Sequence, residues 1–389
     1  MKLSPVPQNI PEWLALKSDL VPVPLAHTHI CFVLSRAVLE AFSQNVFEAF
    51  NEKPLSLIQA SEKTQLNKRA LNSLLNVLLS AGYFKYSNGN YSLTKHSRKW
   101  CLKESKHSLY NQQMFNLICW DWMNHMPEFL KTGKGLQYHD TFNEAEWELY
   151  QKGMESVAAN TSTTSVKIAP RLTNPVSMLD IGGSHGLYSA AFCNKYPSLK
   201  STILDLPQAV DKAEPLLRAK YKGNNIQYRK GNALSDDFGN DEHDIVLMSS
   251  LMHHFSEEQN LSVSKTISKS LKKGGYFIIQ EFIRPEPSSN MDMLGATLDL
   301  FFNLSSTSGN WSIDELIAFQ KKSGLTHVRT NRFMMLPGFV QVIGRKNQES
   351  RTKNQESRTK NQEPRIKNQE SRTKNQELRI KNQEPRTKN

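Results

Sequence analysis

Cysteine and long apolar runs are both scarce in this sequence. Its 389 residues make 44.4 kDa, room for two or three domains, and include only four cysteines, Cys31, Cys101, Cys119 and Cys193. These are far apart and form no CxxC pair, so we predict reduced thiols in an intracellular chain and no metal site. No uncharged apolar run approaches the roughly 18 residues that span a bilayer, and the opening segment has no apolar signal core. We therefore expect a cytoplasmic protein without a membrane partner.

Positive charge is plentiful, but much of it lies at the C-terminal end. The net charge is +12, and residues 346–389, which repeat a heptapeptide containing KNQE, carry seven Lys and six Arg against six Glu, or +7. The period suits a coiled coil, yet no position of the repeat is consistently apolar, and Pro364 and Pro385 interrupt a helix. We predict a solvated, disordered tail. The alternative is a polycation that touches nucleic acid or lipid, which is weakened because each Glu offsets neighbouring positive charges.

Residues 1–105 are predicted to form a mainly helical domain with a winged-helix pattern. Between Arg36 and Thr94 the pattern is three helices followed by a hairpin. The third helix follows Asn67, a candidate N-cap, and its apolar stripe consists of Leu71, Leu74, Leu75, Leu78 and Leu79. The hairpin turns at Asn88-Gly89, because these residue types tolerate the positive φ of a tight turn.

A winged helix has two uses of different class. It binds DNA when polar residues of the third helix enter the major groove, and the candidates here are Lys68, Arg69, Asn72 and Asn76, with Lys85 on phosphate. A winged helix can instead serve as a dimerisation scaffold. Polar residues are ordinary on an exposed helix face, so they do not by themselves indicate DNA binding. This stretch alone leaves both uses open.

The remaining body divides into a helical connector and an α/β region. Residues 106–170 have a helical pattern and many aromatic residues, which fill a core or wall a pocket for a flat molecule. Over 171–345 strands alternate with helices, which predicts a parallel sheet covered by helices. The expected strands are 176–180, 200–204, 226–229, 244–249 and 276–281, and the expected helices are 187–196, 207–219 and 256–272. Ligands of such sheets bind beyond the carboxyl ends of the strands.

The first expected strand runs into a glycine-rich loop, Asp180-Ile-Gly-Gly-Ser-His-Gly186. Missing side chains let a ligand approach the backbone, and the following helix offers N–H groups at its positive end. Asp205 ends the second strand, nineteen residues after Gly186, where a carboxylate can accept both hydroxyls of a ribose. The loop is not the dinucleotide GxGxxG, because Gly182 and Gly183 are adjacent. The combination predicts a nucleoside-type cofactor.

Several motifs in a fixed order resemble the S-adenosylmethionine-dependent small-molecule O-methyltransferases, which include plant phenolic and bacterial polyketide or antibiotic enzymes. They are the winged helix, Tyr150-Gln-Lys-Gly-Met154, the glycine loop, Leu-Asp-Leu-Pro, Gly231-Asn232, Met252-His-His-Phe255, Lys273-Gly-Gly275 before a strand, Glu281 and the closing strand Gly-Phe-Val-Gln-Val-Ile-Gly. The resemblance covers roughly residues 20–345. It implies an α/β fold with a Rossmann-like class I methyltransferase domain at 171–345, an acceptor-lining connector, an N-terminal winged-helix dimerisation domain and a homodimer.

Carried over onto this chain, the resemblance implies a site for S-adenosyl-L-methionine and a small-molecule acceptor, with nucleic acid unlikely. The implied cofactor residues are Asp180, Gly182, Gly183, Gly186, Asp205, Leu206, Asn232 and Ala233. The implied acceptor residues are Trp120, Tyr150, Met154, His254 and Asn310. His253 is the implied general base, and Glu281 the carboxylate that steadies its imidazole. A neutral imidazole suits this role because its ordinary pKa is about 6.5.

Three positions depart from the family pattern. His253-His254-Phe255 stands where many relatives have His-Asp-Trp, Asn232 where an Asp is usual, and Asn310 where a second Glu is often found. Adjacent histidines are also compatible with a metal, although no matching carboxylate motif lies nearby. The alternatives in function are a DNA-binding regulator that senses a nucleoside cofactor, an N- or C-methyltransferase of the same fold, and a repurposed fold with another reaction.

Overall fold

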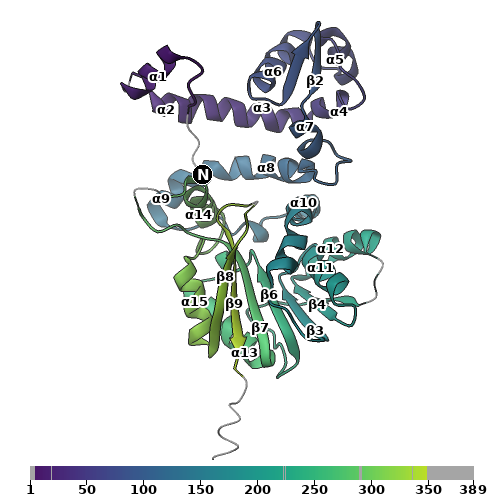
Figure 1. Cartoon of the computed structure of the whole chain (residues 1–389), viewed down its shortest axis with the longest axis vertical. Coiled ribbons are helices and arrows are strands. Elements are labelled where there is room, and N and C mark those ends of the chain that lie inside the picture. Colours follow the sequence, from purple (N-terminus) through teal and green to yellow (C-terminus); the bar gives the residue numbers. More distant parts are fainter. Residues whose placement is uncertain are drawn as a thin grey trace, which may run out of the picture. The chain divides into compact units, whose positions relative to one another are not determined.

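The computed structural model describes residues 5–18, 20–221, 223, 225–288, 291–334 and 336–347 (Figure 1). Its N-terminal part is helical and contains a two-stranded hairpin. The elements are α1 (Ile10–Lys17), α2 (Val23–Leu25), η1 (Ala26–Ile30), α3 (Cys31–Ser43), α4 (Val46–Ala49), α5 (Leu57–Thr64), α6 (Lys68–Ser80), β1 (Phe84–Ser87), β2 (Asn90–Leu93) and α7 (Lys95–Trp100). The predicted disorder of the tail falls on residues that, beyond Asn347, lie outside the described ones.

The third helix of the winged-helix pattern, α6, begins where the sequence predicts. Asn67 Oδ1 accepts hydrogen bonds from the backbone N–H groups of Arg69 and Ala70, at 3.0 and 3.2 Å. The hairpin turns at Asn88 and Gly89 with φ of 51° and 77°. The stripe of α6 is buried at Leu71, Leu75 and Leu78. These side chains join a hydrophobic core that α3 to α7 share with the hairpin, so the predicted pattern is confirmed.

The connector is helical, as expected, and its aromatic rings pack against one another. It consists of α8 (Tyr110–Trp122), η2 (Met123–His125), α9 (Met126–Thr132), η3 (Tyr138–Asp140) and α10 (Glu144–Ile168). Trp122 stacks on Tyr138 with ring centroids 4.5 Å apart, and Tyr150 meets Phe115 edge-on at 5.4 Å. Gly135 lies so close to the chain that follows Ser305 that an added Cβ would be 2.1 Å from the carbonyl oxygen of Ser306. This close approach fixes the segment that leads into η3.

The C-terminal part contains a seven-stranded sheet with the order β5-β4-β3-β6-β7-β9-β8. The first five strands in this order are parallel, and β9 runs antiparallel to both β7 and β8. The strands are β3 (Ser177–Ile181), β4 (Lys200–Asp205), β5 (Ile226–Lys230), β6 (His243–Ser249), β7 (Leu271–Phe282), β8 (Leu325–Arg332) and β9 (Phe339–Lys346). The helices are α11 (Leu187–Lys195), α12 (Pro207–Lys220), η4 (Met252–His254), α13 (Glu257–Ser270), α14 (Met293–Ser305) and α15 (Ile313–Lys322).

Side chains alternate between the two faces of this sheet, and each face has its own core. On one face Leu179, Ile181 and Val246 pack in a cluster that includes residues of α13 and α15. On the other face Met178 and Ile245 pack in a cluster that includes residues of α10, α11 and α12. Helices therefore cover both faces, and the carboxyl ends of the parallel strands remain as the edge where a ligand can bind.

The sequence misplaces one boundary and misses one strand. The helix expected over 256–272 ends at Ser270, and β7 begins at Leu271 instead of 276, because Leu271 already pairs with His243 before the register shifts. The strand β8 was not predicted. It is an edge strand whose sequence, Leu-Thr-His-Val-Arg-Thr-Asn-Arg, has no run of apolar alternation, since only its first residue is buried.

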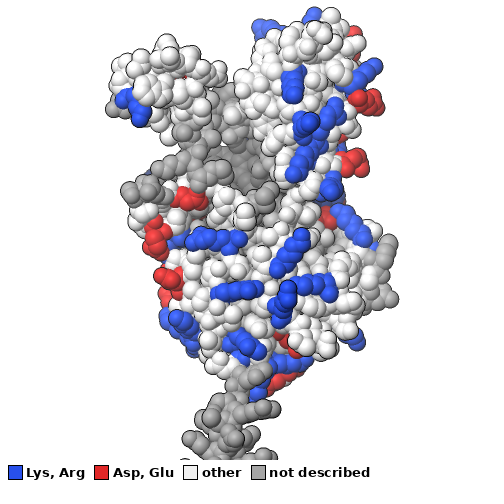
Figure 2. Space-filling model, viewed as in Figure 1, with Lys and Arg blue, Asp and Glu red and all other residues white. Residues whose placement is uncertain are grey.

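The N-terminal helices carry much exposed apolar surface. One continuous helical segment of the described residues, Val23–Ser43, is long and apolar enough to cross a membrane by length and composition, although core helices and signal sequences pass the same test. Large apolar side chains are exposed on α1, α2, η1 and α3, including Ile10, Trp13, Leu14, Leu25, Ile30 and Phe32. Figure 2 shows few charged side chains where Figure 1 labels α1 and α2.

Candidate active site

The glycine-rich loop after β3 is built for close approach to its surroundings. Gly182 has a φ of 67°, and a Cβ there would be 2.8 Å from Leu251 Cδ2. A Cβ on Gly183 would be 2.6 Å from the Cγ of Asp180, which lies buried against it. Asp180 Oδ2 accepts a hydrogen bond from Ser189 Oγ at 2.7 Å, and burial raises the pKa of this carboxyl to about 7. Asp180 therefore supports the loop from inside the fold.

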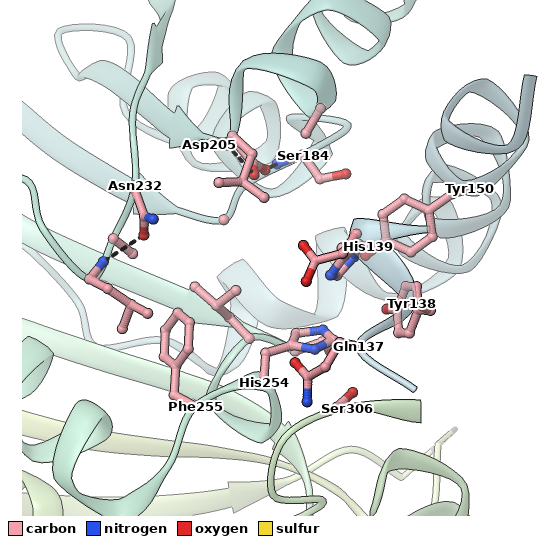
Figure 3. Close-up of a pocket in the computed structure, with 18 of the residues that line it drawn as sticks. Gln137, Tyr138, His139, Tyr150, Ser184, Asp205, Asn232, His254, Phe255 and Ser306 are labelled. Atoms are coloured by element: carbon pink, nitrogen blue, oxygen red, sulfur yellow. Dashed lines mark hydrogen bonds between the residues drawn. The ribbon is translucent and has the colours of Figure 1, made fainter. Parts of the chain in front are cut away.

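Asp205 stands at the end of β4, beside the loop (Figure 3). Its Oδ2 accepts from the backbone N–H of Ser184 and its Oδ1 from that of Leu206, each at 2.8 Å. Burial raises the pKa of Asp205 to about 6, and these two backbone hydrogen bonds act in the opposite direction. Ser184 is further fixed by its carbonyl oxygen, which accepts from Tyr228 Oη at 2.9 Å. The carboxylate and the loop thus form one connected unit.

A cavity of about 260 Å³ opens at these strand ends. Its walls come from η3, α10, the glycine loop, the ends of β4 and β5, and η4 with its flanks (Figure 3). The lining residues are Gln137, Tyr138, His139, Asp140, Trp147, Tyr150, Gln151, Gly182, Ser184, Leu204, Asp205, Leu206, Ala209, Gly231, Asn232, Ala233, Leu234, Ser250, Leu251, His254, Phe255, Ser305 and Ser306. The end of the cavity at the glycine loop and Asp205 is therefore lined by polar and main-chain atoms, and the end at Tyr138 and Tyr150 is lined by aromatic side chains.

Two histidines from different parts of the chain meet at the aromatic end. The ring centroids of His139 and His254 are 4.7 Å apart, and His139 stacks on Trp147 at 5.4 Å. Burial, and then the neighbouring His253, lower the pKa of His139 to about 3 and that of His254 well below the ordinary value. Both imidazoles are therefore neutral at pH 7 and offer one donor and one acceptor nitrogen each.

His253 lies behind this wall and is paired with a carboxylate. Its side chain is 3% exposed, and its Nδ1 is 3.1 Å from Glu281 Oε2. Glu281 Oε1 accepts from the backbone N–H groups of Leu251 and Met252, each at 2.7 Å. The His253 ring packs on His254, with centroids 4.2 Å apart. Glu281 therefore fixes both the turn before His253 and the Nδ1 side of its imidazole.

The residues implied by the sequence separate into two groups in the structure. The cavity wall contains Tyr150, Gly182, Asp205, Leu206, Asn232, Ala233 and His254. Outside its lining lie Asp180, Gly183, Gly186, His253, Glu281, Met154, Trp120 and Asn310. Trp120 packs on Phe32 of α3, with ring centroids 5.5 Å apart. The Asn310 side chain is buried, and neither of its polar atoms has a partner among the described residues. Asn232 uses its Oδ1 to accept from the backbone N–H of Leu234, at 2.9 Å.

Sequence reasoning missed several wall residues, including His139, Ser184 and Gln151. His139 lies in a short helical turn without a motif, and only the fold brings it to His254. Ser184 is inside the glycine loop, so its place was available from the sequence. Gln151 follows Tyr150 in the motif Tyr-Gln-Lys-Gly-Met, but helical periodicity does not reveal that its side chain reaches Ser184 Oγ.

The site fits a nucleoside with a charged amino-acid end. Gly182 brings a backbone without a side chain to the cavity wall, and the carboxylate of Asp205 in the same wall is the kind of acceptor that ribose hydroxyls use. The buried Nε2 of Gln151 has no partner among the described residues, although this side chain lines the cavity. Among the described residues no group of three or more His, Cys, Asp or Glu side chains is arranged to bind a metal ion.

Comparison with known proteins shows that methyltransferases share this fold and are similar to this chain in sequence. Human N-acetylserotonin methyltransferase in complex with SAM has the same fold, with a TM-score of 0.74 over 88% of this chain and 99% of that chain at 16% identity. Among sequence relatives, O-methyltransferase 7 of Dictyostelium discoideum is 23% identical over 69% of this chain and 80% of its own length. The 3-hydroxy-5-methyl-1-naphthoate 3-O-methyltransferase of Streptomyces sahachiroi is 21% identical over 77% of this chain and 88% of its own length. The fold and the site therefore define a class I methyltransferase.

A family model places the chain more narrowly. Residues 121–312, which contain the whole cavity wall and His253, match the model described as an O-methyltransferase domain. Residues 121–312 therefore carry an O-methyltransferase domain, and the protein is an S-adenosylmethionine-dependent O-methyltransferase. Its cofactor is S-adenosyl-L-methionine, as the resemblance implies and in agreement with the nucleoside-type cofactor that the glycine loop and Asp205 predict.

Proposed function

We propose that this enzyme methylates a hydroxyl group of a small, flat aromatic metabolite and that His253 removes the proton of that hydroxyl. The observation that carries the acceptor class is the aromatic end of the cavity, where Trp147, Tyr150 and Tyr138 line the wall. Bound S-adenosylmethionine supplies a methyl group on a positively charged sulfur. Two similar proteins are named after aromatic acceptors, a hydroxynaphthoate and N-acetylserotonin, which supports the same class here.

The proposed proton path uses the His253–Glu281 pair. Because Glu281 Oε2 faces Nδ1, the Nδ1–H donates to the carboxylate, and Nε2 keeps its lone pair. Bound S-adenosylmethionine would supply the methyl carbon to the acceptor oxygen, with its sulfur as the leaving group, and Nε2 of His253 would take the hydroxyl proton. Glu281 then stabilises the imidazolium that forms. Neutral His254 and His139, which line the cavity, orient the acceptor through hydrogen bonds.

The test separates the two adjacent histidines. Hydroxylated naphthoates, indoles and flavonols are screened with a labelled methyl donor, and the best acceptor is then used with His253→Ala and His254→Ala. We expect H253A to lower kcat by roughly 10²- to 10⁴-fold with little change in the Kd of S-adenosylhomocysteine. We expect H254A mainly to raise the KM of the acceptor. If H253A is fully active and H254A is inactive, His254 and not His253 is the general base. If the enzyme methylates only amines or carbons, the proposed hydroxyl acceptor is wrong.

We also propose a cytoplasmic homodimer whose N-terminal domain, residues 1–105, is the dimerisation domain. The exposed apolar side chains of α1, α2 and α3 need a cover, and the second copy of this chain is the proposed one. Phe32, which is 59% exposed, is the test position. Phe32→Asp is expected to give monomers in light scattering, and an unchanged dimer would refute this interface.

A further inference from the structure

Gln151 of α10 is a fully buried side chain in the wall of the cofactor cavity. Its Oε1 accepts a hydrogen bond from the Oγ of Ser184, so one end of the amide is bound to the glycine loop. Its Nε2 has no partner among the described residues. Buried amide N–H groups in folded proteins nearly always have a partner, so this one is expected to donate to a ligand.

The position of Ser184 limits where that ligand group lies. The Ser184 N–H donates to Asp205, and its carbonyl oxygen accepts from Tyr228. The glycine loop is therefore bound on one side by Asp205, the proposed ribose ligand. Gln151 contacts the same loop from α10. Figure 3 shows Ser184 between Asp205 and the aromatic side chains of the connector. The Nε2 of Gln151 thus lies beside the loop at the start of α11, at the polar end of the cavity.

Charge in the cavity wall decides which ligand group suits this donor. The wall as the structure describes it contains no lysine or arginine, and its two histidines are neutral at pH 7. A carboxylate in this cavity has no cation to pair with and must be bound by neutral N–H donors. The amino-acid end of S-adenosylmethionine carries such a carboxylate. Gln151 is the wall glutamine whose N–H₂ group is buried and still unpaired.

We propose that Gln151 Nε2 donates a hydrogen bond to the carboxylate of the cofactor and so selects a cofactor with an intact amino-acid end. Ser184 is a positioning residue in this account, because its hydroxyl sets the orientation of the Gln151 amide. The inference rests on the S-adenosylmethionine site described above. It does not depend on the acceptor or on the role of His253.

Binding measured by calorimetry in the absence of any acceptor tests this selection. The two probes are S-adenosylmethionine and decarboxylated S-adenosylmethionine, which differ only in the carboxylate. Gln151→Met keeps the size of the side chain and removes the donor, and we expect it to raise the Kd of S-adenosylmethionine by about 10- to 100-fold. The Kd of the decarboxylated probe is expected to change by less than about twofold.

Two further variants exclude a general effect on the fold. Gln151→Glu, measured at pH 8, keeps an oxygen for Ser184 and places an anion beside the carboxylate, so it is expected to lose S-adenosylmethionine at least as strongly. Gln137→Leu is the matched control, because Gln137 lines the same cavity but its Oε1 accepts from Thr307. Its ratio of the two Kd values is expected to equal that of the wild type.

The outcomes are distinguishable. If Q151M weakens both probes equally, Gln151 only supports the glycine loop, and the proposal is wrong. If neither Kd changes, the amide does not contact the cofactor at all. If the wild-type protein binds neither probe, the cofactor site itself is refuted, whereas an inactive enzyme that still shows the selective loss would leave this inference standing and overturn the proposed acceptor chemistry.

Discussion

Replacing Glu281 by glutamine tests the base in a way that the geometry makes specific. Glu281 Oε1 accepts from two backbone N–H groups, so a glutamine at this position keeps its oxygen there and turns its Nε2 toward His253. A donor then faces His253 Nδ1, which must become the acceptor, and the imidazole proton moves to Nε2. The nitrogen that is proposed to take the hydroxyl proton would no longer have a lone pair.

The size of the effect follows from what is lost and what is kept. Loss of general-base catalysis is expected to lower kcat by roughly 10²- to 10⁴-fold, or about 2.7 to 5.4 kcal/mol in activation free energy. The two backbone hydrogen bonds survive in Glu281→Gln, so its melting temperature is expected to stay close to that of the wild type. Glu281→Ala leaves both N–H groups buried without a partner, which costs about 1–3 kcal/mol for each.

The assay compares kcat with cofactor affinity. Methyl transfer is measured with a labelled donor, and the Kd of S-adenosylhomocysteine by calorimetry. Because Glu281 lies outside the cavity lining, that Kd is expected to change by less than about twofold in Glu281→Gln. Glu148→Gln, which alters an exposed ion pair with Lys152, is the control. A Glu281→Gln enzyme with wild-type kcat would show that the tautomer of His253 is irrelevant to the reaction.

Three further predictions concern the cofactor end of the site. Gly183→Ala places a Cβ 2.6 Å from Asp180 Cγ, so we expect a loss of about 1–3 kcal/mol in chemical denaturation, and an unchanged midpoint would contradict the packing. Asp205→Asn is expected to raise the Kd of S-adenosylhomocysteine by roughly 10- to 100-fold, and an unchanged Kd would show that Asp205 does not bind the ribose. Burial raises the pKa of Asp180 to about 7, above its ordinary 3.8, so the native state binds this proton more tightly than the unfolded chain, and stability is lost as pH rises between these values. Asp180→Asn should therefore gain melting temperature relative to the wild type across that window, and a difference that does not vary with pH would refute the assignment.

Much of the fold could be predicted because short-range rules set it. Asn67 caps α6, Asn88-Gly89 closes the hairpin, and the alternation of strands with helices along the chain places the five parallel strands close to their observed bounds. The edge strand β8 escaped, because a strand exposed at the edge of a sheet does not need an apolar pattern. The end of α13 was placed too late, because the pairing of Leu271 with His243 depends on a distant strand.

The sequence by itself determined the chemistry-bearing motifs: the glycine loop, Asp205 at the next strand end, and the His253-His254 pair. Each depends on a few neighbouring residues and on the rule that parallel strands carry ligands at their carboxyl ends. Only the tertiary structure decided that His139 joins His254 in the cavity wall, that His253 lies behind it, and that Gln151 reaches Ser184. Such contacts join segments far apart in the chain, and they form only when the packing of η3, α10 and η4 brings their side chains together.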